Sequence, residues 1–301
     1  MRHGTYSIVA LDPATGELGA AVQSHWFSVG SLCTWARPGI GAAATQSVVE
    51  PAHGPAALDR LAAGAGAAEA LAGLLAADPL AAVRQVGVVD AGGGVAVHTG
   101  ADCIAHAGDA AGAHWTCQAN MMAAATVPAA MSAAFEHAEG DLAARLMAAL
   151  EAAEGEGGDI RGRQSAALLV VPAQGEPWRA RVDLRVEDHP EPLTELWRLF
   201  ALQRAYELAG EADELMASGR DAEAGELYRR AAELAPGSDE LLFWAGLAIA
   251  NSGDLEAGAD AVRRAAAARP DWLVLLDRLS PDFAPAGPEV RRALGRGDGP
   301  S

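Results

Sequence analysis

The sequence predicts an α+β protein in two parts, a strand-rich part that ends near residue 190 and an all-α part after it. The predicted strands come in antiparallel pairs joined by short turns, and the helices between them also come in pairs. Near the C-terminus, a pattern recurs after 34 residues. Hairpins segregated from paired helices favour a layered α+β fold over a parallel, doubly wound sheet. We therefore expect one domain over residues 1–190 and a second over 191–301.

The first hairpin is predicted over residues 5–11 and 18–24, because β-branched, aromatic and aliphatic residues flank the turn residues 12–16. The other elements of the first domain follow from the same patterns: strands 32–36 and 40–46, helices 56–63 and 67–77, strands 86–89 and 95–99, helices 128–137 and 141–153, and strands 165–171 and 179–186. Pro190 and Pro192 then break the chain before the helical domain.

The C-terminal repeat resembles the tetratricopeptide repeat (TPR), a helix-turn-helix unit that stacks into a solenoid. Small residues at helix crossings, an aromatic or aliphatic residue and a closing proline recur in order at positions 219, 224, 228, 231 and 236 and again at 253, 258, 262, 265 and 270. The predicted helices are 193–206, 208–217, 220–234, 238–251 and 254–268, with a capping segment at 272–279. Such a domain would hold a protein or peptide partner in its concave face or would dimerise the chain. The alternative is an Ala-rich helical bundle.

Composition excludes several functions. The net charge of −18 argues against nucleic acid and anionic membrane surfaces as partners, and the chain has no lysine for a P-loop or a Schiff base. Cys33, Cys103 and Cys117 are odd in number and lack CxxC spacing, so we expect neither disulfides nor zinc. With neither an apolar span of about 20 residues nor a signal-peptide core, we expect a cytoplasmic protein. Hydrolysis by a threonine nucleophile would need no cofactor.

Thr5 is a candidate N-terminal nucleophile, since it opens the first strand after Gly4. A free N-terminal threonine has an amine with a pKa of about 8, which can take the proton of its own hydroxyl. Methionine removal alone would not free Thr5, because Arg2 follows Met1, so Met1 to Gly4 would have to leave by cleavage before Thr5. The alternative is that Thr5 is an ordinary strand residue after a short tail.

Several short sequence segments resemble segments of the DUF1028 family and occur in the same order, over about residues 5–200. They lie at residues 5–10, 15–22, 41–46, 84–90, 118–122, 157–168 and 183–189. That family is similar to the N-terminal nucleophile (Ntn) hydrolases, so the resemblance implies a four-layer αββα sandwich with the nucleophile on the first strand. It implies no particular activity. Relatives commonly begin with methionine directly before this threonine, whereas Arg2 to Gly4 intervene here. The chain therefore cleaves itself, starts elsewhere, or does not use Thr5 in catalysis.

Within that frame, Arg37 and Asn120 are candidates to assist Thr5. Arg37 lies on the third predicted strand, where Ntn relatives often place a cation that depresses the pKa of the nucleophile's amine. A surface arginine before a turn is the favoured alternative. Asn120 follows Gln118 and offers an amide donor for an oxyanion, or bonds nearby backbone in a loop.

The segment 157–162 is the densest cluster of glycines and charges before a strand, so it is a candidate part of the site. Asp159 and Arg161 could fix each other or a substrate carboxylate. Gln164 and Ser165 begin the next strand, where alternation lets only one of them point inward with Asp159. Two further candidate substrate contacts lie at strand ends: Ser24, beside His25, and Gln46, for which a turn cap is the alternative.

The sequence thus predicts an Ntn-type amidohydrolase that acts on a small amide or peptide-like substrate. Thr5 would attack the carbonyl, Asn120 would hold the oxyanion, and Arg161 or Arg37 would bind a carboxylate. One alternative is a non-catalytic Ntn-like scaffold that forms homo-oligomers and recruits a protein or peptide through its repeats. Another is an enzyme that uses Asp159 and Ser165, with Thr5 merely structural.

Overall fold

The computed structural model of the chain describes residues 4–297. These residues belong to two compact units that divide between Trp197 and Arg198. The first unit is a mixed α/β unit and the second is helical. Within the described residues, no helix is both long and apolar enough to cross a membrane.

Two antiparallel sheets build the first unit in the described part of the chain. The larger sheet has the order β10-β9-β2-β1-β8-β7, and its strands are β1 (Thr5–Leu11), β2 (Leu18–Ser24), β7 (Gly108–Gly112), β8 (Trp115–Asn120), β9 (Ser165–Val171) and β10 (Val182–Val186). The smaller sheet has the order β3-β4-β5-β6, and its strands are β3 (Thr34–Arg37), β4 (Gly41–Ser47), β5 (Arg84–Asp90) and β6 (Val95–Thr99). The three predicted hairpins, β1-β2, β3-β4 and β5-β6, are confirmed.

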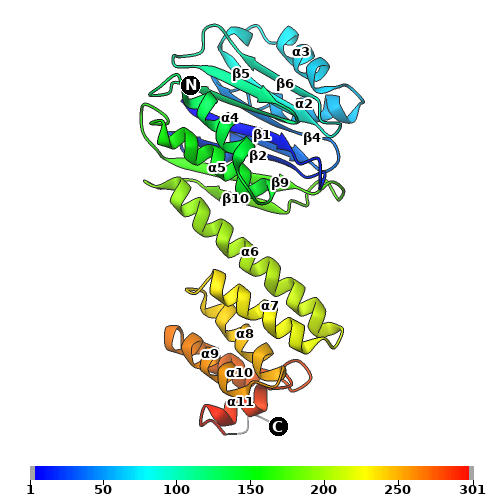
Figure 1. Ribbon diagram of the computed structural model, residues 1–301, viewed down its shortest axis with the longest axis vertical. Helices are drawn as coiled ribbons and strands as arrows, with labels where there is room; N and C mark the ends of the chain where they lie inside the picture. The colour runs from blue at the N-terminus through cyan, green and yellow to red at the C-terminus, as the bar shows by residue number, and fades with distance from the viewer. Residues whose placement is uncertain (1–3, 298–301) are drawn as a thin grey trace. The chain divides into compact units, whose positions relative to one another are not determined.

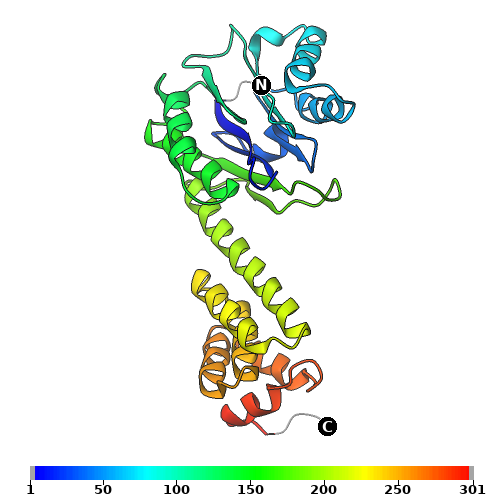
Figure 2. The same cartoon turned by 45° about the vertical axis from the view of Figure 1, so that its right-hand side comes forward.

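The sheets pack face to face, with helices on their outer faces. Helices α4 (Val127–His137) and α5 (Leu142–Gly155) cover the larger sheet, and α2 (His53–Ala62) and α3 (Ala67–Ala77) cover the smaller one. Figure 1 labels these layers, and Figure 2 shows the two helix pairs on opposite sides of the strands. Alanines on both inner faces let the sheets approach closely, since Ala20 packs with Ala42 and Ala44.

Side chains alternate between the two faces of β1, so that one face is turned to α5 and the other to the smaller sheet. Tyr6 points to α5, where its hydroxyl donates a 2.6 Å hydrogen bond to Glu154. Ser7 points to the smaller sheet, where its hydroxyl donates a 2.6 Å hydrogen bond to Gln46. Thr5 shares the face of Ser7, so it lies between the two sheets.

Several sequence expectations differ from the structure. The predicted strand 32–36 begins only at Thr34, since residues 30–33 form the short helix α1 (Gly30–Cys33). Strands β7 and β8 were not predicted, because their Gly- and Ala-rich segments have little intrinsic strand preference; pairing of β8 with β1 places them in the sheet. The predicted last strand, 179–186, begins only at Val182, after the Pro177 loop. Helix α6 (Pro192–Ala217) runs through the break predicted between residues 206 and 208, since neither a proline nor a left-handed residue interrupts it there.

The second unit continues α6 with α7 (Asp221–Leu234), α8 (Asp239–Asn251), α9 (Leu255–Ala268), α10 (Asp271–Arg278) and α11 (Gly287–Ala293). The predicted helices 220–234, 238–251 and 254–268 are confirmed to within a residue at each end. Two of them begin at side-chain caps, since Ser238 accepts from the amide of Leu241 and Asp254 from that of Ala257.

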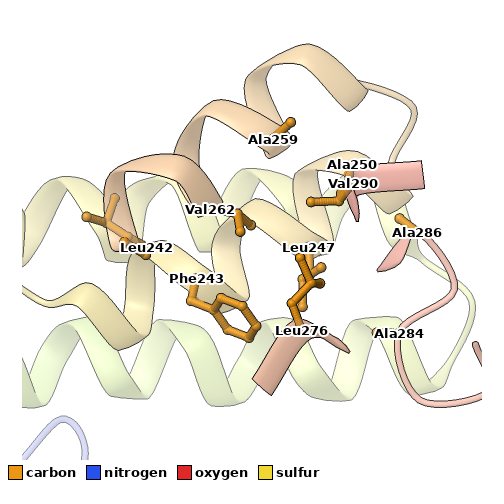
Figure 3. Packing of buried hydrophobic residues seen from close by; sticks show 11 residues of the cluster. Leu242, Phe243, Leu247, Ala250, Ala259, Val262, Leu276, Ala284, Ala286 and Val290 are labelled. Atoms are coloured by element: carbon orange, nitrogen blue, oxygen red, sulfur yellow. The ribbon is translucent and has the colours of Figure 1, made fainter. Parts of the chain in front are cut away.

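An apolar cluster holds α8 to the last three helices. Figure 3 shows Phe243 and Leu247 of α8 packed toward Val262 of α9 and Leu276 of α10. Small residues allow this close crossing: a β-carbon on Gly258 would lie 2.5 Å from the carbonyl oxygen of Gly246. The small residue that the repeat pattern predicted at position 258 therefore has a packing role.

Candidate functional site

A row of polar side chains crosses the larger sheet at the beginning of β1. Ser165, Ser24, Thr5 and Asn120 lie directly opposite one another on β9, β2, β1 and β8. Residues opposite each other in antiparallel strands share one face, and here that face is turned to the smaller sheet. All four are buried. The structure therefore brings together four of the residues that the sequence singled out.

The carbonyl group that precedes Thr5 is held by two donors. The Thr5 hydroxyl donates to Ser24 Oγ at 3.1 Å, and Ser24 Oγ donates in turn to the carbonyl oxygen of Gly4 at 2.5 Å. Arg161 Nη2 donates to the same oxygen at 2.9 Å. A hydroxyl and a guanidinium thus polarise the carbonyl of the Gly4–Thr5 peptide, and the nucleophile candidate belongs to the same chain of hydrogen bonds.

Asp159 fixes Arg161 in this position. Its Oδ1 accepts from Arg161 Nε at 3.0 Å and from the Arg161 amide at 2.9 Å, and its Oδ2 accepts from Arg161 Nη2 at 2.7 Å and from the His25 amide at 3.1 Å. The Asp159 side chain is 0% exposed. Because this carboxylate is completely bonded and enclosed, it is a rigid support for the guanidinium.

The loop that carries Asp159 is anchored on both sides. Asp159 forms a bridge to Met122, directly after β8. On the other side, the carboxylate of Glu154, at the end of α5, accepts hydrogen bonds from the side chains of Tyr6 and of Arg163, which lies in the same loop as Asp159. Burial, with the Glu154 carboxylate beside it, raises the pKa of the Tyr6 phenol well above its ordinary value. This loop is therefore tied to Tyr6, the neighbour of Thr5.

Amide side chains from both sheets hold the other side of Thr5. Gln46 Nε2 donates to the carbonyl oxygen of Thr5 at 3.1 Å and to Gln85 Oε1 at 2.8 Å. Asn120 Nδ2 donates to the same two acceptors, at 3.4 Å and 2.9 Å. The amide of Asn120 is thereby engaged with the peptide after Thr5 and is not directed at the Gly4 carbonyl.

Ser7 and Gln118 extend this network. Gln118 Nε2 donates to Ser7 Oγ at 2.5 Å, and Gln118 Oε1 is buried without a hydrogen-bond partner. Sequence analysis did not select Ser7, Gln85 or Gln118 as site residues. The available signal was polar residues at alternate positions of otherwise apolar strands, 5 and 7 in β1 and 118 and 120 in β8.

A cavity of about 10 Å³ lies beside Thr5, which is room for about one water molecule. Its lining includes Trp26, Val29 and Cys33. Burial raises the pKa of the Cys33 thiol to about 12, so this cysteine stays protonated and does not compete with Thr5 as a nucleophile. The cavity beside Thr5 is thus small and lined mostly by apolar side chains.

Two non-glycine residues with positive φ directly follow site residues. Ser47 has a φ of 71° after Gln46, and Met121 has a φ of 59° after Asn120. Such backbone costs of order 1–3 kcal/mol and persists where the surroundings impose it. The strained backbone therefore directly follows the two residues, Gln46 and Asn120, whose side-chain amides bond the Thr5 carbonyl.

Three sequence candidates have other surroundings. Arg37 pairs with Asp59 at 3.0 Å and lies opposite Gly41, at the end of β4 distant from Gln46, so the structure does not bring it to Thr5. Gln164 donates to Asp188 at 3.1 Å and is not in the row. Ser165 is in the row, but its hydroxyl is used to hold the loop over the pocket, since it donates to the Trp26 carbonyl and accepts from the Val29 amide.

Within residues 4–297, no group of three or more His, Cys, Asp or Glu side chains is arranged to hold a metal ion. The chemistry that the described groups themselves offer is that of a hydroxyl nucleophile beside a polarised amide carbonyl.

Comparisons place the first unit among proteins of similar sequence and structure. Residues 5–196 match the model of a family described as a family of unknown function, DUF1028. The crystal structure of a protein from Silicibacter pomeroyi, assigned to the same family, is 31% identical, with a TM-score of 0.60. The match covers 65% of this chain and 88% of that one. The comparison with curated proteins found no match.

Proposed function

The chain belongs to the DUF1028 family, and we propose that it is an Ntn-type amidohydrolase with Thr5 as its nucleophile. One observation carries the proposal: the Gly4 carbonyl oxygen accepts from Ser24 Oγ and Arg161 Nη2, while the Thr5 hydroxyl donates to Ser24. The packing of two sheets between two helix pairs supports an αββα Ntn-hydrolase-like fold, in which β1 carries the nucleophile.

The first reaction is cleavage of the chain before Thr5. Thr5 Oγ attacks the Gly4 carbonyl carbon, and Ser24 and Arg161 hold the oxygen that becomes negative. The carbon–nitrogen bond of the peptide breaks, the hydroxyl proton passes to the Thr5 nitrogen, and an ester forms between Gly4 and Thr5 Oγ. Water then hydrolyses the ester, which releases residues 1–4 as a carboxylic acid and frees the Thr5 amine. Met1, Arg2 and His3 lie outside the described residues, whereas Gly4 and Thr5 lie inside them.

The same groups would then act on an external amide. An α-amine has an ordinary pKa of about 8, so the free Thr5 amine can serve as the general base for its own hydroxyl. The substrate carbonyl takes the position of the Gly4 carbonyl, and Arg161 and Ser24 hold its oxygen. The cavity beside Thr5 has room for only about one water molecule, so the substrate would take the space that residues 1–4 leave, and the proposed substrate class is small amides or peptide-like molecules.

Intact mass of the purified protein beside a Thr5→Ala variant tests the proposal. We expect the parent chain to lack the mass of residues 1–4 and the variant to retain it. Retention in both proteins would contradict the nucleophile role. Loss in both would show that another protease removes the segment, and amide hydrolysis by the Thr5→Ala variant would then favour the alternative enzyme based on Asp159 and Ser165.

A second candidate function, as a scaffold that binds a partner, rests on a pocket in the helical unit. This pocket has a volume of about 680 Å³ and lies among α6, α8 and the segment before α11. Its lining includes Tyr206, Trp244 and Phe283 together with the carboxylates of Asp213 and Glu240, and the described lining residues include no arginine. Aromatic rings beside carboxylates fit the basic, apolar segment of a protein or peptide.

Calorimetric titration with a basic peptide such as Ac-Phe-Arg-NH₂, beside its citrulline analogue, tests this second function. The arginine peptide should bind more tightly, and Glu240→Gln should reduce the difference. Equal binding of the two peptides would contradict it.

A further inference from the structure

The orientation of the Asn120 side-chain amide is fixed by its surroundings. Asn120 Nδ2 donates to the carbonyl oxygen of Thr5 at 3.4 Å and to Gln85 Oε1 at 2.9 Å. Gln85 cannot turn its own nitrogen toward Asn120, because Gln85 Nε2 already donates to Thr99 Oγ1 and to two backbone carbonyls. Since both neighbours on this side are acceptors, the amide nitrogen of Asn120 belongs there, and Asn120 Oδ1 is turned away from them.

Asn120 Oδ1 is an acceptor that the uncleaved chain does not use. The residue is 1% exposed, and its Oδ1 has no hydrogen-bond partner among the described residues. A buried polar atom without a partner is destabilising and is uncommon in native proteins. Gln118 Oε1 is a second such acceptor in this network, but Gln118 lies opposite Ser7, whereas Asn120 lies opposite Thr5.

The nitrogen of Thr5 points toward β8, the strand that carries Asn120. Gln46 Nε2 donates to the carbonyl oxygens of both Thr5 on β1 and Gln118 on β8. One donor reaches both oxygens because both lie in the gap between these two strands. In an antiparallel pair, the N–H and the C=O of one residue point to the same side. The Thr5 nitrogen therefore lies on the side of Asn120, the residue directly opposite it.

Cleavage before Thr5 changes what this nitrogen requires. In the peptide bond the nitrogen has one N–H donor, whereas a free amine has two and an ammonium has three. Thr5 is 1% exposed, so the additional donors arise at a position that is buried in the uncleaved chain. Buried donors are normally paired with acceptors. Asn120 Oδ1 is an unpaired acceptor on the residue opposite, and it is available to the new amine.

We propose that Asn120 Oδ1 accepts a hydrogen bond from the Thr5 amine that cleavage frees, which makes Asn120 a positioning residue for the general base. With one N–H of the amine held toward β8, the lone pair of the nitrogen can face the Thr5 hydroxyl. The acceptor also favours the ammonium over the neutral amine. This inference rests on the proposed function, in which the Thr5 amine is the general base. Asn120 then holds the amine, in place of the oxyanion role that the sequence suggested.

Titratable side chains reach the surroundings of Thr5 from several elements. They are His25, Cys33, Asp159 and Arg161, with Tyr6 and Glu154 on the other face of β1. Asp159 and Arg161 form an ion pair, so their opposite charges offset each other at the amine. Cys33 stays protonated, because burial raises the pKa of its thiol to about 12. In the described part of the chain none of these groups is hydrogen-bonded to Asn120, so a substitution of Asn120 leaves them in place.

The test measures the pKa of the Thr5 amine in the full chain with residues 2–4 deleted, so that methionine removal alone frees Thr5, which intact mass verifies. The chain is labelled with ¹³C,¹⁵N-threonine, and the chemical shift of the Thr5 α-carbon is followed as the pH changes. Asn120→Leu removes the acceptor at similar size. Because the acceptor favours the ammonium, its loss should lower the pKa of the amine by at least about one pH unit, a tenfold change in the protonation equilibrium.

Gln46→Leu in the same background is the matched control. Gln46 Nε2 donates to the same two acceptors as Asn120 Nδ2, the Thr5 carbonyl and Gln85 Oε1. The control therefore loses an equivalent pair of donor contacts but keeps Asn120 Oδ1, and the pKa of its amine should stay close to that of the parent. Equal pKa values for the amine in Asn120→Leu and Gln46→Leu would overturn the inference.

A crystal structure of the same shortened chain tests the contact without any substitution at Asn120. We expect the Thr5 nitrogen within about 3.2 Å of Asn120 Oδ1, the range of an N–H···O hydrogen bond. An amine bonded to other acceptors, with Asn120 Oδ1 still unpaired, would contradict the proposed contact. The proposed function is judged separately, by Thr5-dependent cleavage of the unaltered chain.

Discussion

Thr5 and Asn120 lie directly opposite each other on β1 and β8, and Asn120 Nδ2 donates a 3.4 Å hydrogen bond to the carbonyl oxygen of Thr5. Gln46 donates to the same oxygen from the smaller sheet. Ser24 and Arg161 hold the carbonyl of the preceding residue, Gly4. The peptide groups before and after Thr5 are therefore both held by hydrogen bonds. This fixed backbone would align the Thr5 hydroxyl with the Gly4–Thr5 peptide bond.

Arg161→Gln should slow cleavage before Thr5 by about 10²–10³-fold, the usual effect of removing one donor from an oxyanion. The uncleaved chain should then accumulate, which a time course of intact mass measures. Arg179→Gln is the control, because Arg179 is an exposed arginine in the loop before β10. Cleavage at the parent rate in Arg161→Gln would show that the guanidinium does not stabilise the oxyanion.

Gln46→Leu should lower the free energy of unfolding by about 1–3 kcal/mol. The substitution leaves the buried carbonyls of Thr5 and Gln118 without the donor that Gln46 provides. Urea unfolding of the variant beside Gln174→Leu, a substitution in an exposed loop, measures the difference. Equal unfolding midpoints for these two variants would be inconsistent with a stabilising role for the amide network.

Gly258→Ala should lower the melting temperature of the helical unit. The new methyl would lie 2.5 Å from the Gly246 carbonyl oxygen and 2.7 Å from Ala250, so α8 and α9 would have to separate. Gly210→Ala is the matched control, since nothing lies within 4 Å of its added carbon and α6 should gain helix propensity. Differential scanning calorimetry gives both values. A higher melting temperature for Gly258→Ala would contradict the close crossing.

Acid should weaken the first unit through Asp78, at the end of the sheet that carries Gln46 and Gln85. Its hydrogen bonds with the Arg84 guanidinium hold the pKa of the Asp78 carboxyl below its ordinary value, and Arg84 in turn bonds the Val48 carbonyl. Because the folded-state pKa is lowered, the unfolded chain binds more protons once the pH approaches about 4, where a free aspartate titrates. The stabilisation is present above that pH and is lost as the pH falls through the folded-state pKa.

Melting temperatures between about pH 5 and pH 2 should therefore fall less steeply in Asp78→Asn than in the parent. Asp59→Asn, an exposed aspartate on α2, controls for the loss of one negative charge. A parallel pH profile in Asp78→Asn and the parent would show that Asp78 does not contribute.

Local sequence predicts most of the individual elements. The β1-β2 hairpin follows from apolar alternation around a turn, and helices α7 to α9 follow from the recurring small residues and their caps. Local sequence does not predict strands β7 and β8. A segment such as residues 108–112 has too little β propensity and becomes a strand only by pairing with β8. The candidate Arg37 likewise depended on a position inferred for the third strand, whereas the register places it opposite Gly41.

By itself, the sequence determined the periodicities and residue types: a threonine at the start of a strand, a glycine-rich acidic loop, and helices of repeating pattern. Only the tertiary structure decided which of these residues meet. Asp159 lies against Gly4, and Gln85 reaches Gln46 and Asn120, through strand register and sheet packing that bring together residues distant in sequence. Periodicity records which face of an element is buried, but the partner of that face depends on non-local contacts, which no local window of sequence contains.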